Sequence, residues 1–370
     1  MNRSQRVVVG AVAVFAAVLV VAVMLWPASA VKPGVDPKTD VVIETADEPT
    51  VVRSLEMLRQ RAKGLDAGVI PFAASTGQGQ VFAQFGWGSG DGQLAHKRPD
   101  EANPEAPMSL ALDARGNVTV LDQVNDRLVK LDKNGKQIGT VPLTVQGAQD
   151  LAIAKDGTTL VLDRVVDKTI AVISPDGKLV GELKLEGKNL EEGGAATGVF
   201  TDGDAVYVER EHGDLVKVGD TKGKADVDRE EVPGRLSRDG TAYLTAGISV
   251  VGEDRVYVGA IEKATKTQRF QREYRLAMPV LALTLLDTDR SGIIYLGALV
   301  HVPVQGKDPR PMVLLVCLDP LDGRPLGKAE LPANVNADET FRELVVADEG
   351  GVFYLFRTDE KAQIQRYDCR

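Results

Sequence analysis

A short unit of strands and polar turns recurs along most of this chain, and it limits the possible folds more than any other feature. Its first copy contains LALDARGNVTVLDQVNDRLVKLD (110–132), in which β-branched, apolar stretches alternate with Asp- and Gly-containing turns. The turn glycine Gly116 recurs as Gly157, 41 residues later, and as Gly203, a further 46 residues on. Weaker copies follow near 246–260, 280–327 and 342–367. The sequence therefore predicts an all-β domain built from about six similar units.

A period of about 40–50 residues with three or four strands per unit is typical of β-propeller blades. One such sheet cannot bury both faces alone, so the units stack radially until a ring closes. Six units predict a six-bladed β-propeller over residues 79–370. The last unit has no room for a fourth strand, and GQVFAQFG (79–86) is a lone strand before the first unit. We predict that strand 79–86 joins the last blade and closes the ring, which removes an exposed sheet edge.

The first unit also resembles a known repeat. FGWGSGDGQL, followed by PEAPMSLALDARGNVTVLDQVNDRLVKLDKNGKQIG, is similar to an NHL repeat in its Phe-Gly-x-Gly lead-in, its proline and its Asp-x-x-Gly turn. The second unit matches in part, and later units share the strand rhythm and the turns. The resemblance implies a six-bladed propeller that serves mainly as a binding platform. It implies no particular ligand.

In NHL-like propellers, the loop after the second strand and the loop entering each blade surround the central channel on one face. The corresponding residues here are Asp122, Asn125, Asp126 and Arg127, then Asp163, Arg164 and Asp167, then Glu209, Arg210 and His212, and finally Arg357, Asp359 and Glu360. Three interpretations stay open. The residues form a charged recognition face for a partner, they supply oxygen ligands for Ca²⁺, or the acids bind loop amides and neighbouring arginines.

Two insertions break the regular rhythm. EKATKTQRFQREYR spaces basic residues three apart on an expected long hairpin of the fourth unit: Lys263, Lys266, Arg269, Arg272 and Arg275. HVPVQGKDPRPM, with His301 and Arg310, is expected to be a Pro-rich loop at the corresponding place in the fifth unit. Because these units are neighbours, the insertions together would form one raised lip, which we predict as a partner site. A solvated hairpin is the alternative for the basic segment.

The N-terminal segment predicts export. Arg3 and Arg6 precede twenty uncharged residues (7–26), enough for a helix to span a bilayer, and Ala28-Ser29-Ala30 has the form of a signal-peptidase site. Residues 1–30 are therefore a signal anchor, which would leave the domain in the periplasm on the inner membrane, or a signal peptide cleaved after Ala30. Residues 31–78 are expected to be a linker with one amphipathic helix at about 48–63.

Composition and missing motifs argue against several classes of function. A net charge of −9 disfavours nucleic acid. Glycine- and serine-centred catalytic or phosphate-binding motifs are missing, and the three histidines lack metal-ligand spacing, so no catalytic residue, metal ligand or cofactor is predicted.

Cys317 and Cys369 fall on third strands of neighbouring units, and two separate thiols are favoured over a disulfide. The sequence predicts a monomeric, non-enzymatic platform for a protein or cell-envelope partner. The alternative is a calcium-dependent hydrolase or lactonase acting at the central channel.

Overall fold

A computed structural model describes residues 41–42, 52–53, 79–304, 306–334 and 340–368. The chain divides into two units, 1–61 and 62–370, and each is considered by itself. In the first unit, β1 (Val41–Val42) pairs antiparallel with β2 (Val52–Arg53). The predicted helix at 48–63 is therefore wrong at Val52 and Arg53. The other residues of the range 48–63 and the 7–26 segment lie outside the described residues. Within the part of the chain that is described, no helix is long and apolar enough to cross a membrane.

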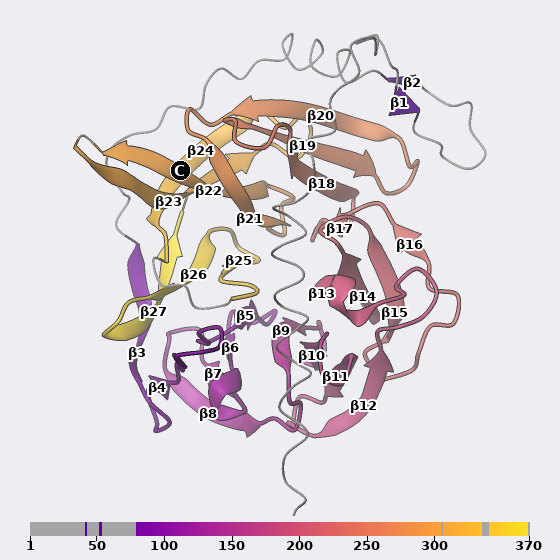
Figure 1. Ribbon diagram of the computed structural model, residues 1–370. Helices are drawn as coiled ribbons and strands as arrows, with labels where there is room; N and C mark the ends of the chain where they lie inside the picture. The colour runs from indigo at the N-terminus through magenta and orange to yellow at the C-terminus, as the bar shows by residue number, and fades with distance from the viewer. Residues whose placement is uncertain (1–40, 43–51, 54–78, 305, 335–339, 369–370) are drawn as a thin grey trace, which may run out of the picture. The chain divides into compact units, whose positions relative to one another are not determined.

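The second unit contains six sheets arranged around a ring, which makes it a six-bladed β-propeller (Figure 1). In each of the first three blades, four successive strands run from the centre outwards. Blade 1 comprises β5 (Ser109–Leu112), β6 (Val118–Asp122), β7 (Arg127–Leu131) and β8 (Gln137–Pro142). Blade 2 comprises β9 (Ala148–Ile153), β10 (Thr159–Asp163), β11 (Thr169–Ile173) and β12 (Leu179–Lys184). Blade 3 comprises β13 (Ala196–Asp202), β14 (Ala205–Arg210), β15 (Leu215–Asp220) and β16 (Glu231–Val232).

The remaining blades include the long strands and the ring closure. Blade 4 comprises β17 (Arg235–Leu236), β18 (Ala242–Ile248), β19 (Arg255–Glu262) and β20 (Gln268–Arg275). Blade 5 comprises β21 (Val280–Thr288), β22 (Ile294–Val304), β23 (Lys307–Leu318) and β24 (Pro325–Pro332). Blade 6 comprises β25 (Leu344–Val346), β26 (Val352–Arg357) and β27 (Lys361–Tyr367), followed by β3 (Gln80–Trp87), which pairs antiparallel with β27, and by β4 (Gln93–Leu94). Strand β3 thus occupies the fourth position of the last blade, and the two-residue strand β4 lies beyond it.

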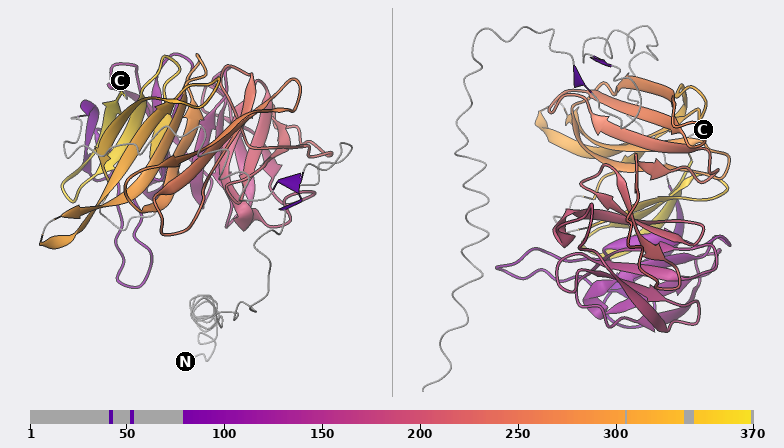
Figure 2. Two further views of the ribbon diagram at one scale, coloured as in Figure 1. Left: turned by 90° about the horizontal axis from the view of Figure 1, so that it is seen from above. Right: turned by 90° about the vertical axis from the view of Figure 1, so that its right-hand side faces the viewer.

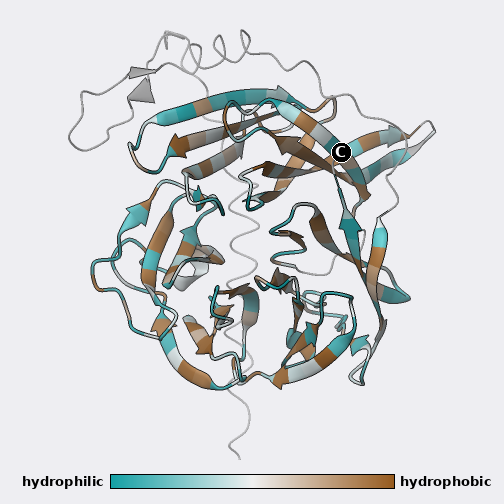
Figure 3. Ribbon diagram, turned by 180° about the vertical axis from the view of Figure 1, so that it is seen from behind, coloured by the Kyte–Doolittle hydropathy of each residue, from teal (hydrophilic) through white to brown (hydrophobic). Residues whose placement is uncertain are grey.

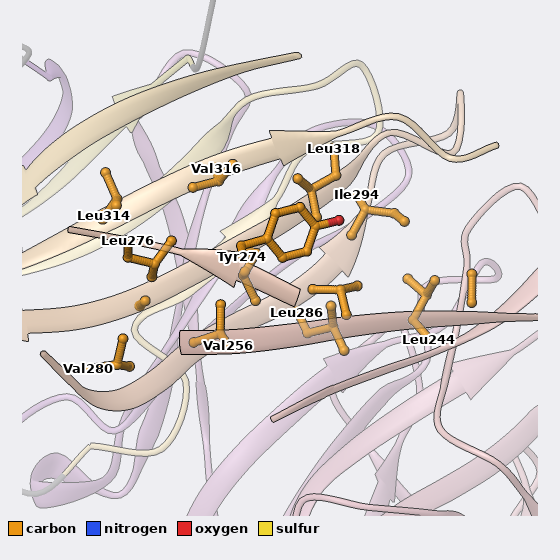
Figure 4. Close-up of a cluster of buried hydrophobic side chains, with 14 of the residues drawn as sticks. Leu244, Val256, Tyr274, Leu276, Val280, Leu286, Ile294, Leu314, Val316 and Leu318 are labelled. Atoms are coloured by element: carbon orange, nitrogen blue, oxygen red, sulfur yellow. The ribbon is translucent and has the colours of Figure 1, made fainter. Parts of the chain in front are cut away.

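The hydrophobic core is distributed over the contacts between blades. Each of the six contacts between neighbouring blades in the described ring contains one cluster of buried apolar side chains. Figure 4 shows the cluster between blades 4 and 5, where Tyr274 lies among Val256, Leu286 and Leu318. Hydrophobic residues are frequent on the strands inside the blades, whereas the outer strand β20 is largely hydrophilic (Figure 3). Stacking in a ring therefore buries both faces of each small sheet.

Alternation of the strands gives the ring two different faces. Turns between the first and second and between the third and fourth strands of each blade form what we call the turn face. Loops between the second and third strands, together with the connections between blades, form the entry face. On the turn face, a recurring aspartate accepts hydrogen bonds from backbone amides two and four residues later, as in Asp113, Asp132, Asp220 and Asp289. These aspartates fix turns, as the sequence indicated.

Blade 4 differs from the sequence-based expectation. The stretches taken as its first and second strands, near 246–260, are its second and third strands, because the innermost strand β17 has two residues. The basic segment therefore forms the β19–β20 turn and β20. It reaches the turn face, where Lys263 pairs with Asp202 of the β13–β14 turn. The other insertion lies between the second and third strands of blade 5 and reaches the entry face. The two insertions consequently do not form one raised lip.

The cysteine expectation also needs correction. Cys317 on β23 is disulfide-bonded, and no free cysteine occurs in the described part of the chain. Third strands of neighbouring blades come together, because Cys317 and Tyr367 on β27 share the buried cluster between blades 5 and 6. The expectation that these strands lie well apart was therefore wrong. The expectation of a free thiol at position 317 was wrong as well. Cys369 lies outside the described residues.

Gly135 supports the closing strand from blade 1, and replacing it by alanine should destabilise the ring. Its φ is +83°, and a Cβ there would lie 2.0 Å from the carbonyl oxygen of Phe82 on β3. Gly240 is a matched control, because its φ is +75° and a Cβ there meets no atom within 4 Å. We expect Gly135→Ala to lower the free energy of unfolding by roughly 1–2 kcal/mol more than Gly240→Ala, measured by urea unfolding. Equal losses would contradict this packing.

Candidate functional site

Asp122, at the end of β6, is a fully buried carboxylate that organises the entrance to blade 1. Its Oδ1 accepts a hydrogen bond from the Ala95 amide (2.9 Å), and its Oδ2 accepts from Asn125 Nδ2 (2.8 Å) and Arg127 Nε (2.8 Å). Arg127 also donates to the carbonyl oxygen of Gln93 at 2.7 Å. The structure thus brings these predicted site residues together, and their polar atoms hold the connection from β4 to the blade.

Asp163 occupies the equivalent position in blade 2 and is also fully buried. Its two oxygens accept hydrogen bonds from the amides of Gly147, Val165, Val166 and Asp167, at 2.8–3.1 Å. A carboxylate with four amide donors fixes the loop conformation. Among the described contacts, none joins the Asp122, Asp163 and Glu209 groups to one another.

The remaining predicted residues of this face have separate partners. Arg210 donates to the carbonyl oxygen of Asn189 and to Glu231, at 2.7 and 2.6 Å. Arg357 is buried, with Nη2 3.7 Å from Glu343. Asp359 pairs with Arg98 at 2.8 Å, and Glu360 and His212 are exposed.

A polar cluster that the sequence did not reveal lies on the inner strands. Asp150 on β9 is fully buried and pairs with Arg342, two residues before β25, at 2.6 Å. The Val199 amide donates to the same carboxylate oxygen at 3.0 Å, and the Arg342 guanidinium lies 4.7 Å from the Phe200 ring centroid. This cluster connects the inner strands of blades 2 and 3 to the entrance of blade 6.

A second ion pair extends the cluster to blade 4. Arg235 on β17 donates to Glu209 at 2.6 Å, and its guanidinium lies 5.1 Å from the centroid of the Phe200 ring. Arg164 of blade 2 lies 5.0 Å from the ring of Phe341. The inner strands are thus joined by arginine–carboxylate and arginine–aromatic contacts, which we call the channel cluster: Asp150, Arg164, Phe200, Glu209, Arg235, Phe341 and Arg342.

Arg164 and Glu209 of the channel cluster belong to the recognition face predicted from the sequence, and one further member, Asp150, had a weak signal. Asp150 is the one charged residue of the buried inner strand β9, and a charged residue there requires a partner. The partners lie 50–190 residues away and form no local motif, so sequence spacing could not identify them.

The pKa of Glu209 reflects this environment. Burial raises its pKa, but the charge of Arg235 and hydrogen bonds from His212, Arg235 and Thr197 outweigh burial and lower the pKa to about 2, from an ordinary 4.5. A carboxylate with a lowered pKa stabilises the fold above pH 4.5, and this contribution is lost as the pH falls from 4.5 towards 2.

Glu209→Gln should therefore be most damaging near neutral pH. We expect the variant to be less stable than the unchanged protein by about 3 kcal/mol at pH 7, because the shift in pKa corresponds to a free energy of that size. The difference should shrink to about 1 kcal/mol at pH 2.5, because Glu209 of the unfolded chain is then protonated and the pH approaches the folded-state pKa of about 2. Urea unfolding at both pH values measures it, and a pH-independent difference would contradict the assignment.

The basic segment of blade 4 is largely paired within the protein. Lys266 donates to Tyr243 Oη at 3.0 Å, Arg269 pairs with Glu262 at 2.7 Å, and Arg275 pairs with Asp254 at 3.1 Å. Arg272 has a buried Nε without a hydrogen-bond partner among the described residues. With Lys263 bound to Asp202, little free positive charge remains here for an acidic partner.

The other insertion is a hairpin and not a loop. Its strands stay paired as far as Val304 and Lys307, with His301 opposite Pro311 and Val302 opposite Arg310. His301 and Arg310 are exposed. Figure 2 shows the tip of this β22–β23 hairpin (orange) extending beyond the rest of its blade. The expectation of an irregular Pro-rich loop was wrong, because paired strands accept prolines at positions that need no ladder hydrogen bond.

Within the described ranges, no group of three or more His, Cys, Asp or Glu side chains is placed to hold a metal ion. The buried acids of the entry face are instead bonded to amides, arginines and hydroxyl groups.

Strand pairing and the channel cluster place this chain in the class of six-bladed β-propellers. No protein-family model and no curated protein matches it, so the NHL resemblance stays a prediction.

Several solved structures are similar in part. Hydrazine synthase from Kuenenia stuttgartiensis is 15% identical, with 70% of this chain and 78% of that chain covered and a TM-score of 0.46. A streptogramin B lyase is 11% identical, with 74% and 97% covered and a TM-score of 0.40. A DUF4221 family member from Bacteroides vulgatus is 10% identical, with 80% and 98% covered and a TM-score of 0.46. No property of these proteins is carried over to this chain.

Proposed function

We propose that this chain is an exported propeller, membrane-anchored or secreted, that acts as a non-enzymatic binding platform for a protein or cell-envelope partner. The β22–β23 hairpin is the observation that carries the proposal. Ordered pairing continues to Val304 and Lys307, although the tip is exposed and contributes nothing to the core between blades. A rigid projection of this kind is a typical contact element for a partner.

Two further features support the location. The uncharged segment 7–26 after Arg3 and Arg6 has the composition of a signal or an anchor. The disulfide at Cys317 suits an oxidising compartment outside the cytoplasm.

Shortening the hairpin tests the proposal. Replacing residues 303–309 by Asn-Gly closes the strands at the Val302–Arg310 pair with a two-residue turn. We expect unchanged stability and loss of the partner. A photo-crosslinking amino acid at position 301 or 310 should capture one protein in the native envelope, whereas the same probe at exposed Val165, in the short loop of blade 2, should not. Retention of the partner by the shortened variant, or equal capture from position 165, would refute this function.

A further inference from the structure

A groove of about 680 Å³ lies on the turn face between blades 6 and 1, opposite the face that carries the hairpin. Four parts of the ring contribute to it: the start of β3, two turns of blade 1, the first turn of blade 5, and the first turn with the second and third strands of blade 6. The groove therefore exists only where the closing strand meets the first blade.

The floor of the groove is apolar. Phe82 on β3 and Phe353 on β26 pack edge to face, with ring centroids 4.9 Å apart and an interplanar angle of 88°. Val81 beside them is 51% exposed, although it lies on a strand whose alternate residues are buried. Phe353 is only 3% exposed and Arg366 lies over its ring, so Val81 and the half-buried Phe82 supply the apolar surface that a ligand can reach. Such a surface favours a ligand with an apolar side chain.

The rim of the groove is predominantly basic. Arg115, Lys133, Arg290 and Arg366 line it, against the acids Asp348 and Glu349. The side chain of Arg115 is 81% exposed and pairs with Asp113 at 3.2 Å. Lys133 is exposed and has no acidic partner among the described residues.

The two acids of the rim cancel only part of this charge, because Asp348 is shared with Arg238 outside the groove lining and Lys133 has no acidic partner among the described residues. Asp348 accepts hydrogen bonds from Arg238 at 3.0 Å and from Arg290 at 2.6 Å. Burial raises the pKa of Asp348, but these two arginines outweigh it and keep the pKa below its ordinary value. Glu349 is 3.7 Å from Arg366. In a chain of net charge −9, this rim is a local excess of positive charge.

We propose that this groove binds an acidic peptide segment of a protein partner, with carboxylates on the basic rim and an apolar side chain on the floor formed by Val81 and Phe82. Charge complementarity favours an anionic ligand. The apolar floor favours a peptide over an anionic polysaccharide, which lacks apolar side chains. The proposal rests on the platform function and adds a second contact surface, on the opposite face.

Panning a phage-displayed random dodecapeptide library on the full-length protein tests it. Enriched sequences should combine Asp or Glu with Leu, Phe or another large apolar residue. Synthetic copies should bind Arg115→Glu/Lys133→Glu at least tenfold more weakly than the unchanged protein. The control Lys155→Glu/Lys222→Glu makes the same change in charge at exposed turns of blades 2 and 3 on the same face, and it should bind normally.

Several outcomes would overturn the proposal: no enrichment, enrichment of neutral or basic sequences, or equal binding to both double variants. Heparin provides the polysaccharide comparison, and groove-dependent binding of heparin without peptide binding would also refute it. The shortened-hairpin variant should bind the peptides normally. Failure of the groove and failure of the hairpin platform are therefore distinguishable.

Discussion

Replacing Phe85 by alanine is expected to destabilise the propeller by about 3–5 kcal/mol, the range for removing a large aromatic side chain from a core. Phe85 is 3% exposed on the closing strand, and it packs in the cluster shared by blades 6 and 1. Its backbone partner across the closure is Ala362 of β27. The substitution therefore leaves a cavity at the one place where the two ends of the ring are joined.

Val81→Ala is the matched control for this experiment. Val81 lies on the same strand and also faces β27 across the ladder, but its side chain is half exposed. We expect a loss below about 1 kcal/mol for this change. Urea unfolding of both variants measures the contrast. If the two losses were equal, β3 would not be part of the buried core.

Arg342→Ala is expected to cost about 3–5 kcal/mol, because it leaves the buried Asp150 carboxylate without its cation. Burial already raises the pKa of Asp150, against the opposing effects of Arg342 and the Val199 amide. Removal of Arg342 should raise that pKa further. The loss should therefore be largest at neutral pH and decrease as the pH is lowered, since protonation relieves the uncompensated charge.

Two comparisons test this interpretation. The double variant Arg342→Ala/Asp150→Ala should be less destabilised than the sum of the single changes, because neither charge is then left unpaired. Lys168→Ala removes an exposed ion pair with Glu186 in blade 2 and should cost less than about 1 kcal/mol. Additive losses at positions 150 and 342 would show that the ion pair does not couple them.

The sequence could predict those parts of the molecule that depend on local pattern. Strand alternation and Asp-x-x-Gly turns identified six blades, because both features are encoded within about ten residues. The order of strands in blade 4 could not be read, because β17 is too short to produce a periodic signal. The β22–β23 hairpin was mistaken for a loop, because its prolines usually indicate irregular structure.

The candidate sites show a stronger limit. Asp122, Asp163 and Glu209 were recognised as repeated acids, but the sequence left open whether they face a ligand or the protein's own donors. Their burial and bonding partners depend on connections from other blades. The groove could not be predicted from the sequence at all, because Phe82, Arg115 and Phe353 come together only after the ring has closed.

Closure by β3 also has a consequence for the order of folding. Most strands of the ring pair with the strand that precedes or follows them in the chain. Strands β27 and β3 do not, and Gln363 donates to Gln84, 279 residues earlier in the chain. During synthesis, β3 emerges early and remains without its neighbour until β27 has been made, whereas blades 1–5 can form from local contacts. Bringing such distant segments together carries the largest loop-closure entropy in the domain. We expect closure to be the slow, late step of folding, and a chain opened between two blades, with β27 and β3 joined directly, to fold faster.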